Sequence, residues 1–369
     1  MLLARCLLLI LLLSPLLAVA QTQGEALERY LFTGALEQKY PLQMELEHNR
    51  ETDAWQGSYF YLNPNTTGEP IQLQGMLDDE GRFQLSEFVE KGDKRSLSGH
   101  FSGSFDPMRT QASGIWSSAD GKRRLSFSLT RIARYEQRTR EQDFRFQLQS
   151  ADDNCPCYEP VSQKPHACVC RARSQTRYPV LDGPEGGLLM QLLEQQKLLE
   201  PSIEASPGDE YPDAGEAQSD VALALYAPPL LSLEVSDYAY NWGAAHGMSA
   251  DSGLNLLLQG QGKARWLALP DLIRADDPCL GQINALLREE LRKQEAPAVL
   301  EPDSWSADLS KLYERSFIIR PGGLVFIFPP YDVAPYAMGI LKAVVPFRAI
   351  AGCIPATSPL APLMAAAKT

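Results

Sequence analysis

The chain has only four histidines in 369 residues, and it lacks the motifs of several common catalytic sites. It has no G-x-S-x-G turn for a nucleophilic serine, no H-E-x-x-H zinc motif and no glycine-rich phosphate loop. No second histidine stands near His246 in the sequence to share a metal ion. We therefore expect no metal, no cofactor and no enzymatic activity.

Basic residues are also scarce. Lysine and arginine together number 34 against 46 aspartates and glutamates, which gives a formal net charge of -12. This balance argues against nucleic acid and anionic membranes as partners, and it favours a basic partner protein through long-range attraction. The alternative is that the acidity only keeps an exported protein soluble.

Only one long apolar run is present, at residues 7–17. It follows Arg5 and precedes the small residues 18–20, which is the pattern of a secretory signal peptide and is too short for a membrane span. Residues 340–354 are apolar too, but charged residues and proline interrupt them. We expect a signal peptide at residues 1–20, no transmembrane segment after its cleavage, and a periplasmic or secreted protein.

Cysteine is scarce as well, with seven residues, of which Cys6 leaves with the predicted signal peptide. An even number of cysteines in an oxidising compartment implies disulfide bonds. Two C-x-C pairs flank residues 158–167 and suit two local bridges, and the last two cysteines are left for each other. The cysteines predicted to form disulfides are Cys155, Cys157, Cys168, Cys170, Cys279 and Cys353.

A zinc site with four thiolates is the alternative for the two C-x-C pairs, because zinc is bound by paired cysteines at short spacing. The usual zinc knuckle has two residues between its cysteines, whereas a single residue here leaves little room for both sulfurs on one ion. His166 would be the natural extra ligand of such a site. Export favours the disulfides.

Residues 21–150 predict an antiparallel β domain. A short helix is expected at residues 24–36, and beyond Leu42 apolar and polar residues alternate between turn-forming residues. Such a meander closes into a small barrel or a sandwich, with alternating aromatic residues in its core rather than on a ligand surface. Strands are expected at residues 57–61, 71–75, 82–85, 97–101, 114–116 and 124–129.

These strands carry a pattern of aromatic, acidic and glycine residues that loosely resembles small exported bacterial β-domains, from which no activity follows. The glycines suit bulges or tight barrel corners. The pattern consists of Tyr59, Tyr61, Leu73, Gly75, Glu87, Gly99, Gly103, Gly114 and Trp116. The polar stretch 131–150 follows, and residues 151–177 are expected to form a disulfide-rich linker hairpin.

Residues 178–369 predict an α+β domain with an antiparallel sheet and packed helices. An amphipathic helix is expected at residues 186–200 and an acidic loop at residues 202–220. A second helix, at residues 280–294, has one apolar face to pack on the sheet. Strands are expected at residues 221–226, 231–240, 255–259, 264–269, 316–319 and 324–328.

Several landmarks of this domain occur in one order: Tyr238-x-Tyr240, then Gly-Ala-Ala-His-Gly at residues 243–247, then Tyr-Asp-Val-Ala-Pro-Tyr-Ala-Met-Gly at residues 331–339. They resemble the C-terminal domain shared by RsiV anti-sigma factors and PdaC peptidoglycan deacetylases, over about residues 178–349. In these anti-sigma factors the domain captures lysozyme, with loops that enter the substrate cleft of the hydrolase. One departure is Ala244, which stands where the family often has glycine, and which would be strained if its φ were positive.

The resemblance implies that the loops at residues 244–249 and 329–336 bind the partner. Aromatic and proline residues on rigid turns bury a large area at small entropic cost, although the proline and tyrosine of the second loop could equally define the fold. The candidate binding residues are Trp242, Ala244, His246, Ser249, Pro329, Pro330, Tyr331, Pro335 and Tyr336.

We therefore consider three functions. The first is a periplasmic or secreted protein that binds a basic lysozyme or a related cell-wall hydrolase. The second is a non-catalytic protein that binds peptidoglycan or another envelope polymer. The third is a hydrolase that uses His246 as a general base, with Asp237, Ser249 and Asp251 nearby in the sequence.

Overall fold

The computed structural model describes residues 21–365, apart from residues 53, 64–69, 79, 92–93, 149–158, 161–167, 201–202, 204–214, 243, 302–308 and 310. The predicted signal peptide lies outside the described residues. Within them, no helix has both the length and the apolar character needed to cross a bilayer.

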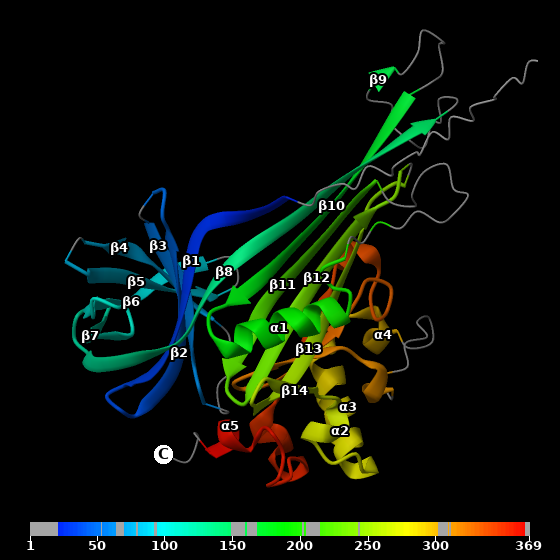
Figure 1. The fold of residues 1–369 in the computed structure, drawn as a ribbon. Coiled ribbons are helices and arrows are strands. Elements are labelled where there is room, and N and C mark those ends of the chain that lie inside the picture. The colour runs from blue at the N-terminus through cyan, green and yellow to red at the C-terminus, as the bar shows by residue number, and fades with distance from the viewer. Residues whose placement is uncertain are drawn as a thin grey trace, which may run out of the picture.

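The first part of the chain is a closed β-barrel (Figure 1). Each strand pairs antiparallel with the next, and the first strand also pairs with the eighth, so that no free edge remains between them. Of the two predicted architectures, barrel and sandwich, the structure has the barrel. Its strands are β1 (Gln21–Leu36), β2 (Tyr40–Asn49), β3 (Ala54–Tyr61), β4 (Ile71–Leu77), β5 (Arg82–Lys91), β6 (Lys94–Phe105), β7 (Gln111–Ser118) and β8 (Arg124–Leu148).

The short helix predicted at residues 24–36 is wrong, because this segment lies in β1. Tyr30 and Phe32 point into the barrel core, whereas Leu31 packs in a separate cluster outside the barrel. This alternation, together with pairing on both sides to β2 and β8, overrides the local preference of the segment for a helix.

Strand β8 continues past the barrel into an open part of the same 14-stranded sheet, which we call the open sheet. Its residues 135–148 pair with β10 (Cys168–Leu181), so the polar stretch 131–148 is strand. Of the predicted linker 151–177, residues 168–177 lie in β10, the short strand β9 (Glu159–Pro160) pairs with β10, and the rest lies outside the described residues. The sheet continues with β11 (Glu216–Ala227), β12 (Leu230–Tyr240), β13 (Met248–Gly260) and β14 (Lys263–Trp266).

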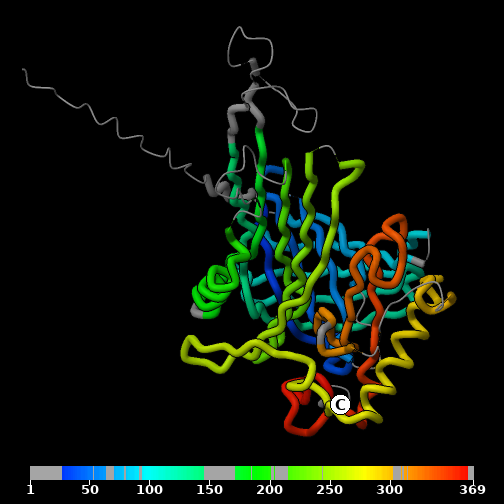
Figure 2. Tube along the Cα trace, turned by 90° about the vertical axis from the view of Figure 1, so that its right-hand side faces the viewer, coloured from blue at the N-terminus to red at the C-terminus, as the bar shows by residue number. Residues whose placement is uncertain are grey.

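The open sheet is covered on both faces (Figure 2). Helix α1 (Pro184–Gln195) packs on one face, and a small antiparallel sheet lies against the other, with helix α3 (Asp277–Lys293) beyond it. The small sheet has strands β15 (Phe317–Arg320), β16 (Gly323–Phe328) and β17 (Leu341–Pro346). The shorter helices are α2 (Leu269–Leu272), α4 (Pro297–Leu300), α5 (Ala361–Ala365) and the 3-10 helices η1 (Leu312–Glu314), η2 (Tyr336–Met338) and η3 (Phe347–Cys353).

The predicted helices of this part are confirmed as α1 and α3, and the predicted strands as β11 to β16. Helix α3 begins where the side chain of Asp276 accepts a hydrogen bond of 3.0 Å from the backbone N–H of Cys279. Its buried residues Ile283, Leu287 and Leu291 recur every four positions and face the small sheet. The α+β class of this region is therefore as predicted.

The outer face of the barrel shares a hydrophobic cluster with the open sheet, separate from the core inside the barrel. Leu31 and Tyr135 of the barrel strands lie in the same cluster as Leu189 and Leu193 of α1. The Tyr135 hydroxyl also donates a hydrogen bond of 2.7 Å to Glu45. This cluster crosses the predicted boundary at residue 150, so the two parts of the molecule pack directly on each other.

The predicted bridge between Cys279 and Cys353 is confirmed, with 5.6 Å between the Cα atoms. It joins the start of α3 to the end of η3, and both cysteines are buried. The predictions for Cys155 and Cys157 fall outside the described residues. For Cys168 and Cys170 the structure describes only the backbone, which is part of β10.

Candidate functional site

The two loops predicted to bind a partner meet in space. The His246 ring stacks on the Tyr336 ring with 3.9 Å between centroids, and Tyr331 stacks against Tyr336 at 6.1 Å. The Tyr336 hydroxyl donates a hydrogen bond of 2.7 Å to the Gly247 carbonyl, which ties one loop to the other. We call His246, Tyr331 and Tyr336 the aromatic triad.

Tyr331 is 54% exposed, His246 is exposed as well, and Tyr336 is half-buried. The φ of Tyr331 is +70°, a left-handed conformation that costs a bulky residue free energy. Its backbone N–H donates to the Ala334 carbonyl at 2.8 Å, which closes the tight turn that imposes this φ. The fold thus holds a large aromatic side chain outward on a strained turn.

A hollow of about 550 Å³ lies beside the aromatic triad. Ser249, Pro329 and Pro330 of the predicted set line it, together with Asp237 and Tyr238 of β12. Its lining mixes apolar rings with hydroxyl and carboxylate groups, which is the composition of a surface that binds polar and apolar parts of a partner.

The other predicted residues do not join the triad. Trp242 packs with Phe144 and Ala217 in a small cluster at the start of β11, and Pro335 precedes η2. Ala244 is not among the non-glycine residues with positive φ in the described part of the chain, so alanine is not strained there. Trp242 is therefore a packing residue rather than part of the exposed loop surface.

The side-chain contacts of His246 are with a backbone carbonyl and an aromatic ring, and none of them is with a carboxylate of the described residues. Its Nδ1 atom lies 2.9 Å from the Gly247 carbonyl, a backbone oxygen, and its ring stacks on Tyr336. A general base of this type is normally oriented by a carboxylate. These contacts tie His246 to its own loop and to the loop of Tyr336.

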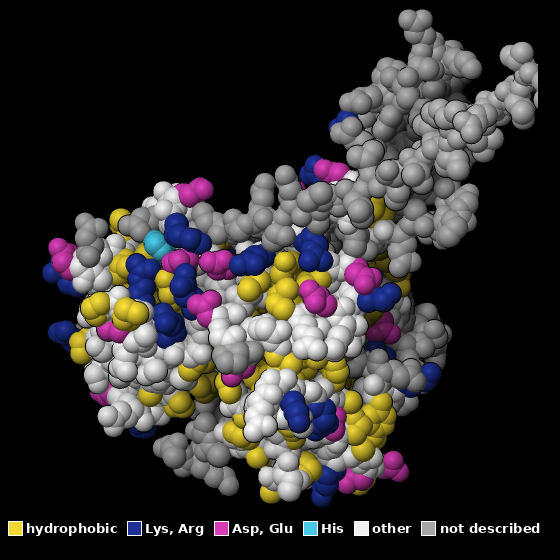
Figure 3. All heavy atoms as spheres, in the orientation of Figure 1, with side chains coloured by type: hydrophobic (Ala, Val, Ile, Leu, Met, Phe, Trp, Pro, Cys, Tyr) yellow, Lys and Arg dark blue, Asp and Glu magenta, His cyan; other side chains and the backbone are white. Residues whose placement is uncertain are grey.

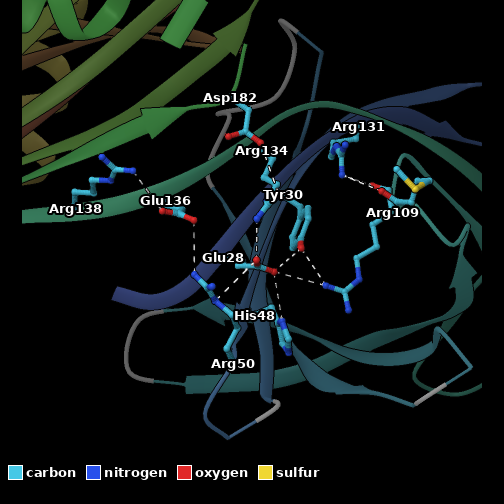
Figure 4. A network of polar contacts seen from close by, with 11 residues as sticks. Glu28, Tyr30, His48, Arg50, Arg109, Arg131, Arg134, Glu136, Arg138 and Asp182 are labelled. Atoms are coloured by element: carbon cyan, nitrogen blue, oxygen red, sulfur yellow. Dashed lines mark hydrogen bonds and ion pairs between the residues drawn. The ribbon is translucent and has the colours of Figure 1, made fainter. Parts of the chain in front are cut away.

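Apart from the two loops, the structure contains a cluster of charged residues that the sequence did not predict. Glu28 lies at one end of the barrel, where the Tyr30 hydroxyl donates to it at 2.6 Å and Arg134 at 2.9 Å (Figure 4). Arg109, Arg50 and His48 lie 3.7, 3.8 and 3.9 Å from the same carboxylate. Figure 3 shows lysine and arginine side chains gathered on this face around a histidine, with acidic side chains between them.

One signal for this cluster was present in the sequence. Arg134, Glu136 and Arg138 alternate along β8 with buried Tyr135 and Gln137, so that one face of the strand is charged. The other members come from β1, β2 and the turns after β2 and β6, and nothing local connects them.

The pKa of Glu28 is lowered by its surroundings. Burial by itself would raise this pKa, but the hydrogen bond from Tyr30 and the positive charges of Arg134, Arg50 and Arg109 outweigh burial and bring it below the usual value of 4.5. Glu28 is therefore ionised at neutral pH and balances the arginines around it.

Replacing Glu28 with glutamine is expected to lower the free energy of unfolding at pH 7 by about 1–3 kcal/mol, because the arginines lose their counter-charge. The folded-state pKa lies below the unfolded-state one, so the stabilisation is complete above the unfolded-state value and is lost as pH falls through the folded-state value. Urea denaturation from pH 7 to pH 3 measures this. Glu80→Gln is the control, because the pair of Glu80 with Arg82 is exposed to solvent and should contribute little to stability. Equal losses at pH 7 and pH 3 would contradict the account.

Three residues of the pattern noted in the barrel strands, Tyr59, Glu87 and Trp116, belong to a buried hydrogen-bond network. Glu87 is 4% exposed and accepts hydrogen bonds from the Tyr59 hydroxyl at 2.7 Å, the Trp116 indole N–H at 2.6 Å and the Ser98 hydroxyl at 2.7 Å. The β5–β6 register shifts beside Glu87, which is a bulge as the glycines suggested. A Cβ atom at Gly99 would lie 2.7 Å from the Trp116 indole nitrogen, so only glycine leaves room for the indole.

A match to a protein family supports the C-terminal assignment. Residues 270–348 match the family described as "Protein of unknown function (DUF3298)". No curated protein matches the chain. A DUF3298 family protein from Pseudomonas aeruginosa PAO1 has 15% identity and a TM-score of 0.35 over 59% of this chain and 94% of its own. A member of the family from Bacteroides fragilis NCTC 9343 has 17% identity and a TM-score of 0.38 over 61% of this chain and 97% of its own.

The family match covers α3, the small sheet and the loop that carries Tyr331 and Tyr336, and it ends close to residue 349, where the sequence resemblance ends. It does not extend to His246. The C-terminal region of this chain therefore contains a DUF3298 domain, the family to which the C-terminal domains of RsiV and PdaC belong.

Proposed function

We propose that this chain is an exported, non-catalytic protein that binds a basic lysozyme or a related cell-wall hydrolase through its aromatic triad. The observation that carries the proposal is the convergence of the two loops, in which His246 and Tyr336 stack beneath the exposed ring of Tyr331. Lysozyme capture by the C-terminal domain that this one resembles supports the choice of partner.

The triad has the physical properties of a protein-binding site. Aromatic side chains dominate binding energy at interfaces because they bury much area and lose little entropy. Tyr331 is held outward by a turn whose φ of +70° is unfavourable for tyrosine, and such strain persists where function requires it. Stacking on Tyr336 fixes its ring before a partner arrives, which lowers the entropic cost of binding.

The charge of the chain suits a basic partner. With a formal net charge of -12, the protein attracts a cationic protein at low ionic strength and accelerates its encounter. The hollow is lined by two acidic residues, Asp237 and Glu200, and by one basic residue, Lys197.

An inhibition assay tests the proposal. If the loops enter the substrate cleft, then addition of the protein to a c-type lysozyme slows hydrolysis of a soluble chito-oligosaccharide, because the cleft is blocked. A soluble substrate is chosen so that coating of an insoluble cell wall cannot mimic inhibition. Unchanged hydrolysis at about micromolar protein, with lysozyme in tenfold lower concentration, would count against the proposal.

A further inference from the structure

A hollow of about 280 Å³ opens at the end of the barrel opposite to Glu28. Its walls come from the β1–β2 turn, the end of β3 and the start of β8, and its lining includes Lys39, Tyr40, Tyr61, Trp116 and Arg123. This volume is at the lower limit of small-molecule pockets and suits a ligand with a single ring.

The rim of this hollow is cationic. Lys39 Nζ lies 5.3 Å and Arg123 Cζ 5.6 Å from the centre of the Tyr40 ring, and Arg123 donates a hydrogen bond of 3.3 Å to the Tyr40 hydroxyl. No aspartate or glutamate occurs among the described residues that line it. The protein has a formal net charge of -12, so the positive charge of this rim is opposite in sign to that of the protein as a whole.

The floor is aromatic and rigid. Trp116 is 9% exposed, and its indole N–H is fixed by Glu87, which also accepts from Tyr59. Tyr61 meets Tyr59 edge to face with 5.5 Å between ring centroids. The buried network thus holds the aromatic surfaces in place before a ligand binds, which reduces the entropic cost of binding.

We propose that this barrel mouth binds a small organic anion in which a carboxylate is attached to a ring. The ring would stack on the faces of Tyr61 and Trp116, and Arg123 with Lys39 would bind the carboxylate, because a guanidinium presents several N–H donors of which Tyr40 takes one. The ring belongs either to a sugar or to an aromatic acid. This proposal concerns the barrel alone and does not depend on the aromatic triad.

A cationic ligand does not fit the same site. An aromatic cage for a cation needs rings without competing positive charges, whereas Lys39 and Arg123 already lie against Tyr40. Glu87 cannot act as a counter-charge at the surface, because it is 4% exposed and accepts three hydrogen bonds from Tyr59, Trp116 and Ser98.

Titrations of the purified, ¹⁵N-labelled full chain test the proposal, with the indole N–H signals of the five tryptophans as the readout. The probes are N-acetylmuramic acid and benzoate, with N-acetylglucosamine and benzamide as their neutral counterparts. Trp116→Phe assigns the signal of the hollow. Arg123→Gln removes the carboxylate partner, and Arg82→Gln, an exposed arginine at the other end of the barrel, is the matched control.

We expect saturable shifts of the Trp116 signal with at least one carboxylate, at a Kd of about 0.1–1 mM, and weaker binding of its neutral counterpart by tenfold or more. Arg123→Gln should weaken binding to a similar extent, and Arg82→Gln should leave it within twofold. Response to the muramic acid alone identifies a sugar acid, and response to benzoate an aromatic acid. No shift with either carboxylate, equal binding of the neutral probes, or full binding by Arg123→Gln would overturn the proposal.

Discussion

Replacing both Cys279 and Cys353 with alanine is expected to lower the free energy of unfolding by about 3–5 kcal/mol. The bridge closes a loop with a sequence separation of 74 residues, and it joins the first turn of α3 to η3 at the back of the small sheet. Cutting such a long loop restores much entropy to the unfolded chain. Urea denaturation followed by circular dichroism measures the loss.

The single variants provide the control for this prediction. Either replacement alone already breaks the bridge, so Cys279→Ala and Cys353→Ala should each be nearly as unstable as the double variant, because their effects act on one cross-link. Additive losses would show that packing of the two buried sulfurs matters more than the cross-link. A loss below about 1 kcal/mol in the double variant would contradict a large contribution of the cross-link.

Replacing Tyr331 with glycine is expected to weaken lysozyme binding by roughly 30-fold or more, since central aromatic residues contribute about 2 kcal/mol or more to an interface. The same variant should not lower the melting temperature, because glycine adopts the φ of +70° without strain. Loss of affinity without loss of stability is the result that distinguishes a binding residue from a structural one. Calorimetric titration and thermal denaturation measure the two quantities.

Tyr313→Gly is the matched control. Tyr313 is 49% exposed against 54% for Tyr331, and it lies in η1, outside both loops. Its replacement should change lysozyme affinity by less than about twofold. Equal losses of affinity in both variants would contradict a role for the aromatic triad.

Much of the fold follows from local patterns in the sequence. The alternation of buried and exposed residues in β3, β6 and β7 reports a half-buried sheet, and the four-residue repeat of Ile283, Leu287 and Leu291 reports a helix on a core. These signals need no knowledge of distant residues. Strands β3 to β7, the start of β8 and helix α3 were predictable for that reason.

Features that depend on distant residues were not predictable in this way. β1 alternates, but only its pairing with both β2 and β8 makes it a strand rather than a helix. The length of β8 depends on β10, which pairs with its polar second half. The Glu28 cluster combines residues up to Arg134, more than one hundred positions away along the chain.

The candidate site was predicted as two separate loops, and the structure supplies the relation between them. The landmarks around His246 and the 331–339 run identified the segments, but no local pattern indicates that His246 stacks on Tyr336. Trp242 stands four residues before His246 and yet packs beside Gly215, where a Cβ would lie 2.1 Å from its indole nitrogen. Proximity in sequence was therefore a poor guide to membership of the triad.

The most direct test of the central proposal is a calorimetric titration of the purified chain with a basic c-type lysozyme at low ionic strength. The account predicts a saturable one-to-one complex with a Kd of about 1 μM or tighter, weakened by added salt because the partners carry opposite net charges. Absence of a complex with both proteins at about 50 μM would contradict it.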